Sequence, residues 1–81
     1  MTTLATPTPP TPAVILVAPA GGGWRMSCDY EEALMFRSGG HAEGEARRLA
    51  RCLAKMGQRG VIEIRDQTDA IVGVIPFRSI L

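Results

Sequence analysis

The chain has few of the residues that usually carry chemistry. Its 81 residues include one histidine, two cysteines, one tryptophan and one tyrosine. A structural zinc site needs about four ligands, so Cys28, Cys52 and His41 are too few to build one. Cys28 and Cys52 instead predict two buried, reduced thiols, with a strand-to-helix disulfide in an exported protein as the alternative. We expect no metal and no cofactor.

A strong net charge and a long apolar run are also missing. The formal net charge of +1 gives no overall field that would attract nucleic acid or an anionic membrane. The apolar segment 13–20 is much shorter than the roughly 20 residues that cross a bilayer. No lysine or arginine precedes Arg25, so this segment lacks the basic region of a signal peptide. We therefore expect a cytoplasmic protein.

Length and proline content predict one domain behind a flexible arm. Residues 1–12 contain four prolines and five threonines, a composition that favours an extended, solvated chain. A ligand for an aromatic groove is the alternative for this arm. Residues 13–81 fit a single small α+β domain, whose stability we expect to be about a few kcal/mol.

Hydrophobic patterning predicts three strands before a helix and two after it. The clearest signal is the alternation of Trp24, Met26, Cys28 and Tyr30, which would all face one side of a sheet. Prolines are expected to end the first and the last strand. The predicted strands are 14–17 (ended by Pro19), 24–30, 33–36, 61–65 (with Ile62 and Ile64 inward) and 70–75 (ended by Pro76).

A helix is predicted from about Gly39 to Met56, with Ser38 as its N-cap and Gly57 just after its end. Glu43 can pair with Arg47 one turn later. The apolar stripe of the helix is expected to contain Ala42, Ala46, Leu49, Ala50, Leu53 and Met56. Short turns between the strands indicate an antiparallel sheet in β-β-β-α-β-β order, with the helix packed across one face.

Several short motifs resemble a family of short bacterial proteins of unknown function. They are Val17-Ala18-Pro19, Gly22-Gly23-Trp24, Ser38 with Ala42, and Ala46-Arg47-Arg48-Leu49-Ala50, and the resemblance covers about residues 17–75. The chain departs from the family's pattern at His41, where the family usually has glutamate, and at Asp69-Ala70, where it has Asp-Gly. The resemblance implies the same element order and no activity.

The candidate catalytic and binding residues do not form a convincing constellation. Cys52 follows His41 by three helical turns, about 16 Å, so the two cannot pair on one helix. Gly21-Gly22-Gly23 joins two strands, whereas a phosphate-binding glycine loop leads into a helix. Trp24 is expected to anchor the core. We therefore predict that the protein is not an enzyme.

The most suggestive surface feature is basic. The candidate interaction residues are Arg47, Arg48, Arg51, Lys55 and Arg59. They could contact an acidic protein or a nucleic-acid backbone, and the solvated face of an amphipathic helix is the alternative. We predict a small interaction or accessory module that acts through protein contacts, with a protein partner or a second copy favoured over nucleic acid. Nucleic-acid binding through the basic helix face is the competing hypothesis, and we expect no membrane or small-molecule ligand.

Overall fold

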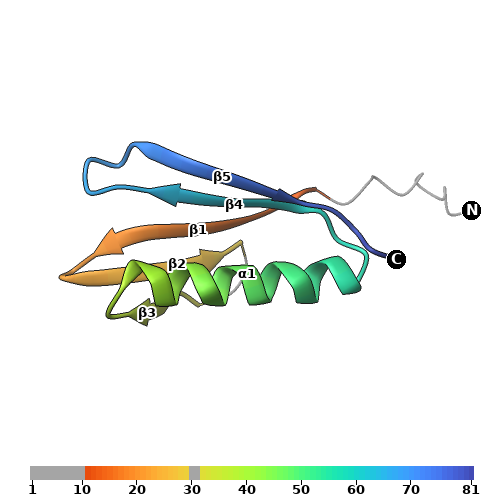
Figure 1. The fold of residues 1–81 in the computed structure, drawn as a ribbon, viewed down its shortest axis with the longest axis horizontal. Coiled ribbons are helices and arrows are strands. Elements are labelled where there is room, and N and C mark those ends of the chain that lie inside the picture. The colour runs from red at the N-terminus through yellow and green to blue at the C-terminus, as the bar shows by residue number, and fades with distance from the viewer. Residues whose placement is uncertain (1–10, 30–31) are drawn as a thin grey trace, which may run out of the picture.

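The computed structural model describes residues 11–29 and 32–81, so most of the predicted arm and Tyr30 lie outside the described residues. One helix lies against a five-stranded sheet (Figure 1). The elements are β1 (Ala13–Ala20), β2 (Gly23–Cys28), β3 (Leu34–Phe36), α1 (Gly39–Lys55), β4 (Gly60–Arg65) and β5 (Ile71–Phe77). The predicted α+β class and the β-β-β-α-β-β order are confirmed.

The sheet is mixed, which corrects the predicted antiparallel arrangement. Its strand order is β3-β2-β1-β4-β5, and the pair at its centre, β1 and β4, is parallel. The helix explains this. Because β3 runs parallel to β1 and α1 carries the chain back to the end where β3 began, β4 must run in the same direction as β1. The other three pairs are antiparallel, as expected.

Two prolines lie inside strands that they were expected to end. β1 continues through Pro19 to Ala20, and β5 continues through Pro76 to Phe77. Pairing of β1 with β4 stops at Val17, so Pro19 lies beyond the reach of β4. Pro76 lies on an edge strand, where a missing N–H group costs no hydrogen bond if it faces outward.

The helix begins as predicted and ends one residue earlier. The Ser38 hydroxyl accepts a hydrogen bond from the backbone N–H of His41 at 3.2 Å, and Gly57 follows the helix with a φ of 89°. Met56 is the C-cap and is 73% exposed, so its predicted place in the apolar stripe is wrong. The buried residues of the helix are Ala42, Ala46, Ala50 and Ala54.

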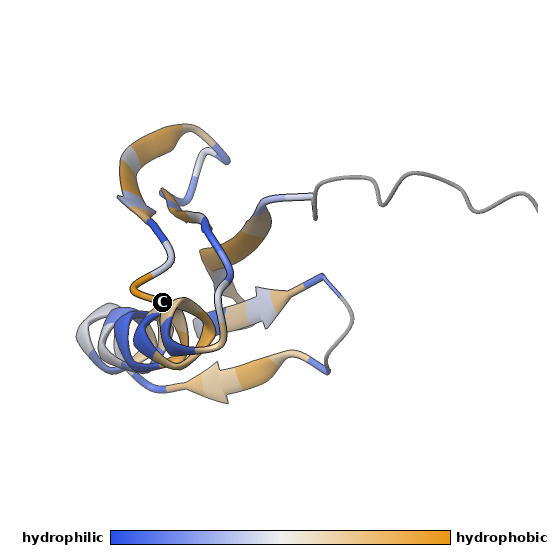
Figure 2. Cartoon of the chain, turned by 90° about the vertical axis from the view of Figure 1, so that its right-hand side faces the viewer, coloured by the Kyte–Doolittle hydropathy of each residue, from blue (hydrophilic) through white to orange (hydrophobic). Residues whose placement is uncertain are grey.

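The core lies between α1 and one part of the sheet. Ile15, Val17 and Ile62 are its largest fully buried side chains, and Met26 joins them from β2. Figure 2, an end-on view, shows that the sheet curls, with α1 near β2 and β3 and with β5 at the far side. The helix therefore covers the sheet unevenly and leaves β5 as its least protected strand.

Candidate protein-interaction surface

β5 is an edge strand, and its outward-facing backbone groups can be assigned from the ladder. The Ala13 N–H donates to the Arg59 carbonyl at 2.9 Å, which directs the backbone groups of Arg59 and Val61 toward β1. Since these groups alternate along a strand, those of Ile62 point the other way, toward β5. Its partner on β5 is Ile75. The N–H and C=O of the neighbouring Val74 therefore point outward.

The same alternation places Pro76 with its ring nitrogen at the free edge, which explains why proline is accepted there. Val72 has the same parity as Val74, and it is the extra residue of an irregularity in the pairing, since Ile64 of β4 pairs with Gly73 and Arg65 pairs with Ile71. The edge thus offers the donors and acceptors of Val72 and Val74 and the carbonyl of Pro76. An unpaired row of this kind is a template for another strand.

The side chains of β5 are apolar and exposed. Ile71 is 53% exposed, Val72 is 62% exposed and Val74 is 55% exposed. The sequence of the strand, Ile-Val-Gly-Val-Ile-Pro-Phe, contains no charged residue. Edge strands of monomeric proteins are usually protected from pairing by lysine, by a charge pointing inward or by shortness. Apart from Pro76 and the irregular pairing near Ile71, β5 has none of these protections.

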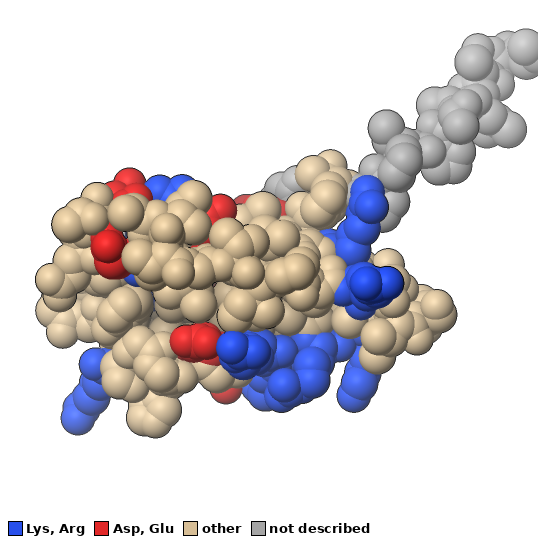
Figure 3. Space-filling view, turned by 45° about the horizontal axis from the view of Figure 1, so that its top comes forward, with Lys and Arg blue, Asp and Glu red and all other residues tan. Residues whose placement is uncertain are grey.

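Charges of opposite sign lie at the two ends of this edge strand. Before it, the turn between β4 and β5 carries Asp66 and Asp69, and the Asp69 carboxylate is 81% exposed. After it comes Arg78, which is exposed and forms no ion pair with any described residue. Figure 3, in which the β5 side is turned toward the viewer, shows a largely uncharged face with most acidic groups toward its left end and most basic groups at its right end and lower edge.

Arg65 fixes the acidic turn to the sheet. Its guanidinium Nη2 lies 2.7 Å from a Glu63 carboxylate oxygen, and its Nη1 lies 3.2 Å from Asp69 Oδ1. The hydrogen bond that Arg65 donates to Glu63, followed by the one that it donates to Asp69, raises the pKa of Arg65. Asp69 has a φ of 64°, so the left-handed residue of this turn precedes Ala70. The turn thus forms with an aspartate, not a glycine, in the left-handed conformation.

Asp66 organises the same turn from inside. Its Oδ1 accepts hydrogen bonds from the Thr68 hydroxyl at 2.6 Å, the Thr68 N–H at 2.8 Å and the Ala70 N–H at 3.1 Å. These bonds, with that of the Thr68 hydroxyl the largest contribution, hold the pKa of Asp66 below its ordinary value. The ionised carboxylate therefore stabilises the start of β5.

This lowered pKa predicts a loss of stability in acid. A carboxyl whose pKa is lower in the folded state stabilises the fold above its unfolded pKa of about 3.9, and that contribution is lost as pH falls through the folded pKa. We expect the melting temperature to fall between about pH 5 and about pH 2, and to fall less in Asp66→Asn. Thermal unfolding followed by circular dichroism measures this. Equal pH dependence in the two proteins would contradict the role given to Asp66.

A hollow separates the C-terminal half of α1 from the end of β5. Its volume is about 440 Å³, and its lining is mostly apolar. Three cationic side chains and no acidic side chain take part in the lining. The last residues of the chain close one side of the hollow, since the Ile80 N–H donates to the Ala54 carbonyl of α1 at 3.1 Å. The lining residues are Ala50, Arg51, Ala54, Lys55, Phe77, Arg78 and Ile80.

The predicted basic residues do not act as one set. Arg47 pairs with Glu43 at 2.9 Å, as predicted, and Arg48 pairs with Glu45 at 2.9 Å. The hydrogen bond from Arg48 lowers the pKa of Glu45, and the same contact raises the pKa of Arg48. These two arginines are therefore neutralised locally.

The other three members of the predicted set form no ion pair with a described residue. Arg51 and Lys55 line the hollow beside β5, while Arg59 is exposed in the turn before β4. Within the described part of the chain, the unpaired cations of α1 thus lie toward its C-terminal end, on the side of β5.

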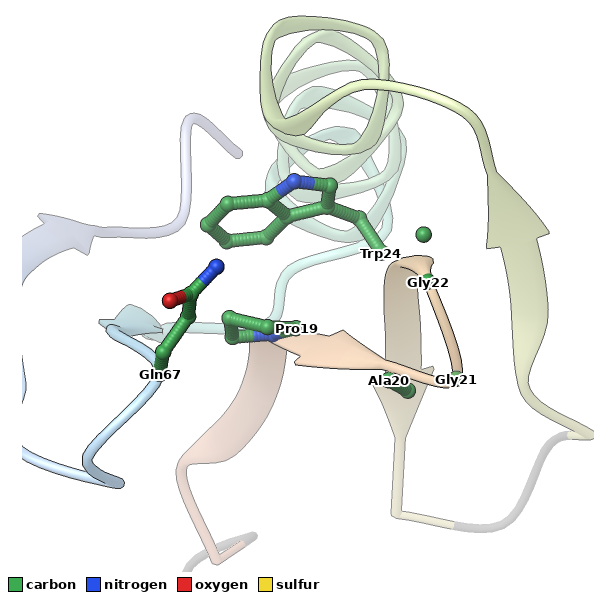
Figure 4. Close-up of a pocket in the computed structure, with 7 residues that line it drawn as sticks. Pro19, Ala20, Gly21, Gly22, Trp24 and Gln67 are labelled. Carbon is green, nitrogen blue, oxygen red and sulfur yellow. The ribbon is translucent and has the colours of Figure 1, made fainter.

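One side of the Trp24 ring packs in the core, as predicted, and the other side borders a pocket at the surface. Its ring packs against the start of α1, where a Cβ on Gly39 would lie only 3.0 Å from Cε2. The other side of the ring borders an open pocket of about 340 Å³, and Figure 4 shows Pro19 and Gln67 across from it. The pocket is also lined by Gly21, Gly22 and Gly23 and carries no ionisable side chain.

Two further predictions can be compared with the structure. Cys28 and Cys52 form no disulfide, but Cys52 is exposed on α1, so its predicted burial is wrong, and Cys28 is only partly buried. His41 lies exposed in the first turn of α1. No group of three potential metal ligands occurs within residues 11–29 and 32–81. The helix in this part of the chain is neither long nor apolar enough to span a membrane.

From the sequence, β5 is not singled out as the edge that carries a binding surface, and the predicted strand ends at Pro76. A strand with no charged residue and with a proline near its end was the available signal, because proline within a sheet is restricted to edges. Searches against protein-family models, curated proteins and solved structures find no match, so the resemblance to the uncharacterised bacterial family stays a prediction.

Proposed function

We propose that this chain is a non-enzymatic interaction module that binds a protein by adding a strand to the β5 edge. The observation that carries the proposal is the outward-facing backbone of Val74 on an apolar strand with three side chains more than half exposed. In strand addition, backbone hydrogen bonds provide affinity and the alternating side chains provide selectivity. Both components are available on β5.

The competing nucleic-acid hypothesis has less support. Binding a phosphate backbone depends on several unpaired cations along one surface. Arg47 and Arg48 are paired with glutamates of the same helix. Of the other three predicted residues, Arg51 and Lys55 border an apolar hollow, and Arg59 lies in the turn before β4. No tryptophan, tyrosine or phenylalanine is interleaved with the basic residues of α1 for stacking on bases.

Proton–nitrogen correlation spectra test the proposal with a defined probe. The probe is a short extended peptide alternating valine and threonine, and its control is the same peptide with prolines in place of valines, which cannot pair along an edge. We expect saturable shifts at Val72, Val74 and their neighbours with the first peptide only. Val74→Pro removes one outward donor without removing a ladder bond, and should weaken this binding about fivefold or more.

Two outcomes would contradict the proposal. One is equal shifts with both peptides, which would mean that binding does not use backbone pairing. The other is the absence of peptide shifts together with salt-sensitive shifts at Arg51, Lys55 and Arg59 on adding mixed oligonucleotides, which would favour nucleic-acid binding.

A further inference from the structure

The charges at the two ends of β5 indicate which kind of strand would pair with it. In an antiparallel pair, the beginning of one strand lies beside the end of the other. β5 begins after the acidic turn that contains Asp69 and ends before Arg78. A strand of the same sequence, added antiparallel, would therefore bring the acidic end of each copy beside the basic end of the other.

We infer that the partner of the β5 edge is a second copy of this chain, paired β5 to β5 around a twofold axis at Val74; this inference rests on the proposed function. With Val74 opposite its own counterpart, each of these two residues donates to and accepts from the other. Each Val72 N–H then faces the Pro76 carbonyl of the second copy. Pro76 has no N–H to return, so the pairing fades at the same point in both copies.

Charge complementarity supports this register. It places Arg78 opposite Ala70 of the second copy, adjacent to that copy's Asp69. Long side chains reach diagonal neighbours about 7–8 Å apart on a sheet, so the exposed Asp69 carboxylate is accessible to the guanidinium. Twofold symmetry produces this contact twice. A parallel pairing would instead place the two acidic turns together and the two Arg78 side chains together.

The apolar side chains of the edge would also become partly covered. Val72 of one copy lies beside Pro76 of the other, and the two Val74 side chains lie beside each other on the sheet face that α1 does not cover. The twofold axis is perpendicular to the sheet, so both helices lie on the same face of a ten-stranded sheet. A seven-residue edge is smaller than the roughly 800 Å² per partner of a standard interface, so the dimer should dissociate on dilution.

Sedimentation equilibrium of the whole chain up to about 0.5 mM tests the inference. We expect a reversible monomer–dimer equilibrium. Val74→Lys should weaken it at least about tenfold, because two like charges would face each other at the axis. Val14→Lys is the matched control, since Val14 is 37% exposed but lies on the central strand β1, and it should change the equilibrium less than about twofold.

A double-mutant cycle tests the register. Asp69→Asn and Arg78→Gln should each weaken the dimer about threefold to fivefold, and the double variant should be little weaker than either one alone. Asparagine is chosen because it tolerates the positive φ of residue 69. Additive effects would overturn the predicted contact between Asp69 and Arg78.

The two proposals can fail separately. A monomer at every concentration that still shows the predicted peptide shifts at Val72 and Val74 would overturn the dimer and leave strand addition in place. A dimer that Val14→Lys disrupts and Val74→Lys does not would overturn β5 pairing in favour of association through the open sheet face. A monomer with no peptide shifts would overturn both.

Discussion

Replacing Gly60 with alanine should unfold most of the protein. Gly60 is buried at the start of β4, where it pairs with Ala13 of β1. A Cβ at this position would overlap the Ala13 carbonyl oxygen and would lie 2.8 Å from its carbonyl carbon and 2.9 Å from its nitrogen. These are backbone atoms of a central strand, so the clash is relieved only if β1 and β4 move apart. We expect a loss of about 3 kcal/mol, comparable to the whole stability of a domain this small.

Urea denaturation followed by circular dichroism measures this loss, with Gly44→Ala as the control. Gly44 lies exposed within α1, and a Cβ there meets no heavy atom within 4 Å. Alanine should therefore stabilise the helix by about 0.5–1 kcal/mol. A loss of stability in Gly60→Ala with a gain in Gly44→Ala would show that the loss comes from steric contact and not from the change in backbone entropy that both substitutions share. A Gly60→Ala protein with the wild-type midpoint would show that β1 and β4 are not packed as described.

The local signals in the sequence were sufficient for the element order. Ser38 and Gly57 mark the two ends of α1 by chemistry that depends on few neighbours, a hydroxyl cap and a positive φ. The alternation around Trp24 and Met26 likewise predicts a strand without knowledge of its partners. These features were predictable because each is determined within a few residues of the chain.

Strand pairing was less predictable because it depends on distant segments. The parallel pairing of β1 with β4 follows from the helix carrying the chain back along the sheet, and no short motif in Val61–Arg65 encodes it. The importance of Gly60 likewise comes from the close approach of Ala13, 47 positions earlier in the sequence, which no local pattern around Gly60 indicates. The predicted strand ends at Pro19 and Pro76 are wrong for the same reason, since Pro76 ends a strand only if its nitrogen faces a neighbouring strand.

On the candidate surface, too, contacts between near neighbours in the sequence were predictable and features that depend on the whole sheet were not. The Glu43–Arg47 pair was predictable from spacing on a helix. The pairing of Arg48 with Glu45 leaves fewer unpaired cations among the basic residues of the helix. Pro76 indicates an edge strand in the sequence, but the exposure of Val72 and Val74 could not be recognised before the strand order was known, because it is a property of the sheet rather than of the strand's own sequence.

Truncating Ile62 should destabilise the protein at least as severely as adding a methyl group at Gly60. Ile62 is 1% exposed on β4, and with Ile15 and Val17 it makes up the largest fully buried side chains. The fully buried residues of α1 are alanines, and its longer apolar side chains, Leu49 and Leu53, pack against the core only partly buried, so the helix can fill little of a cavity left in the sheet. Ile62→Ala should therefore cost about 3–4 kcal/mol, within the range for buried isoleucine.

The matched control is Ile71→Ala, the same truncation on the exposed edge strand. Ile71 is 53% exposed, so we expect Ile71→Ala to lower the free energy of unfolding by less than about 1 kcal/mol. Both variants are measured in dilute solution, where the outer edge of β5 has no partner strand. If the inferred dimer forms, the Ile71→Ala loss should increase with protein concentration, because the wild type alone gains the full stability of association. A large loss for Ile71→Ala in dilute solution would instead place Ile71 in the core of the monomer, and would remove part of the apolar edge on which the proposed function rests.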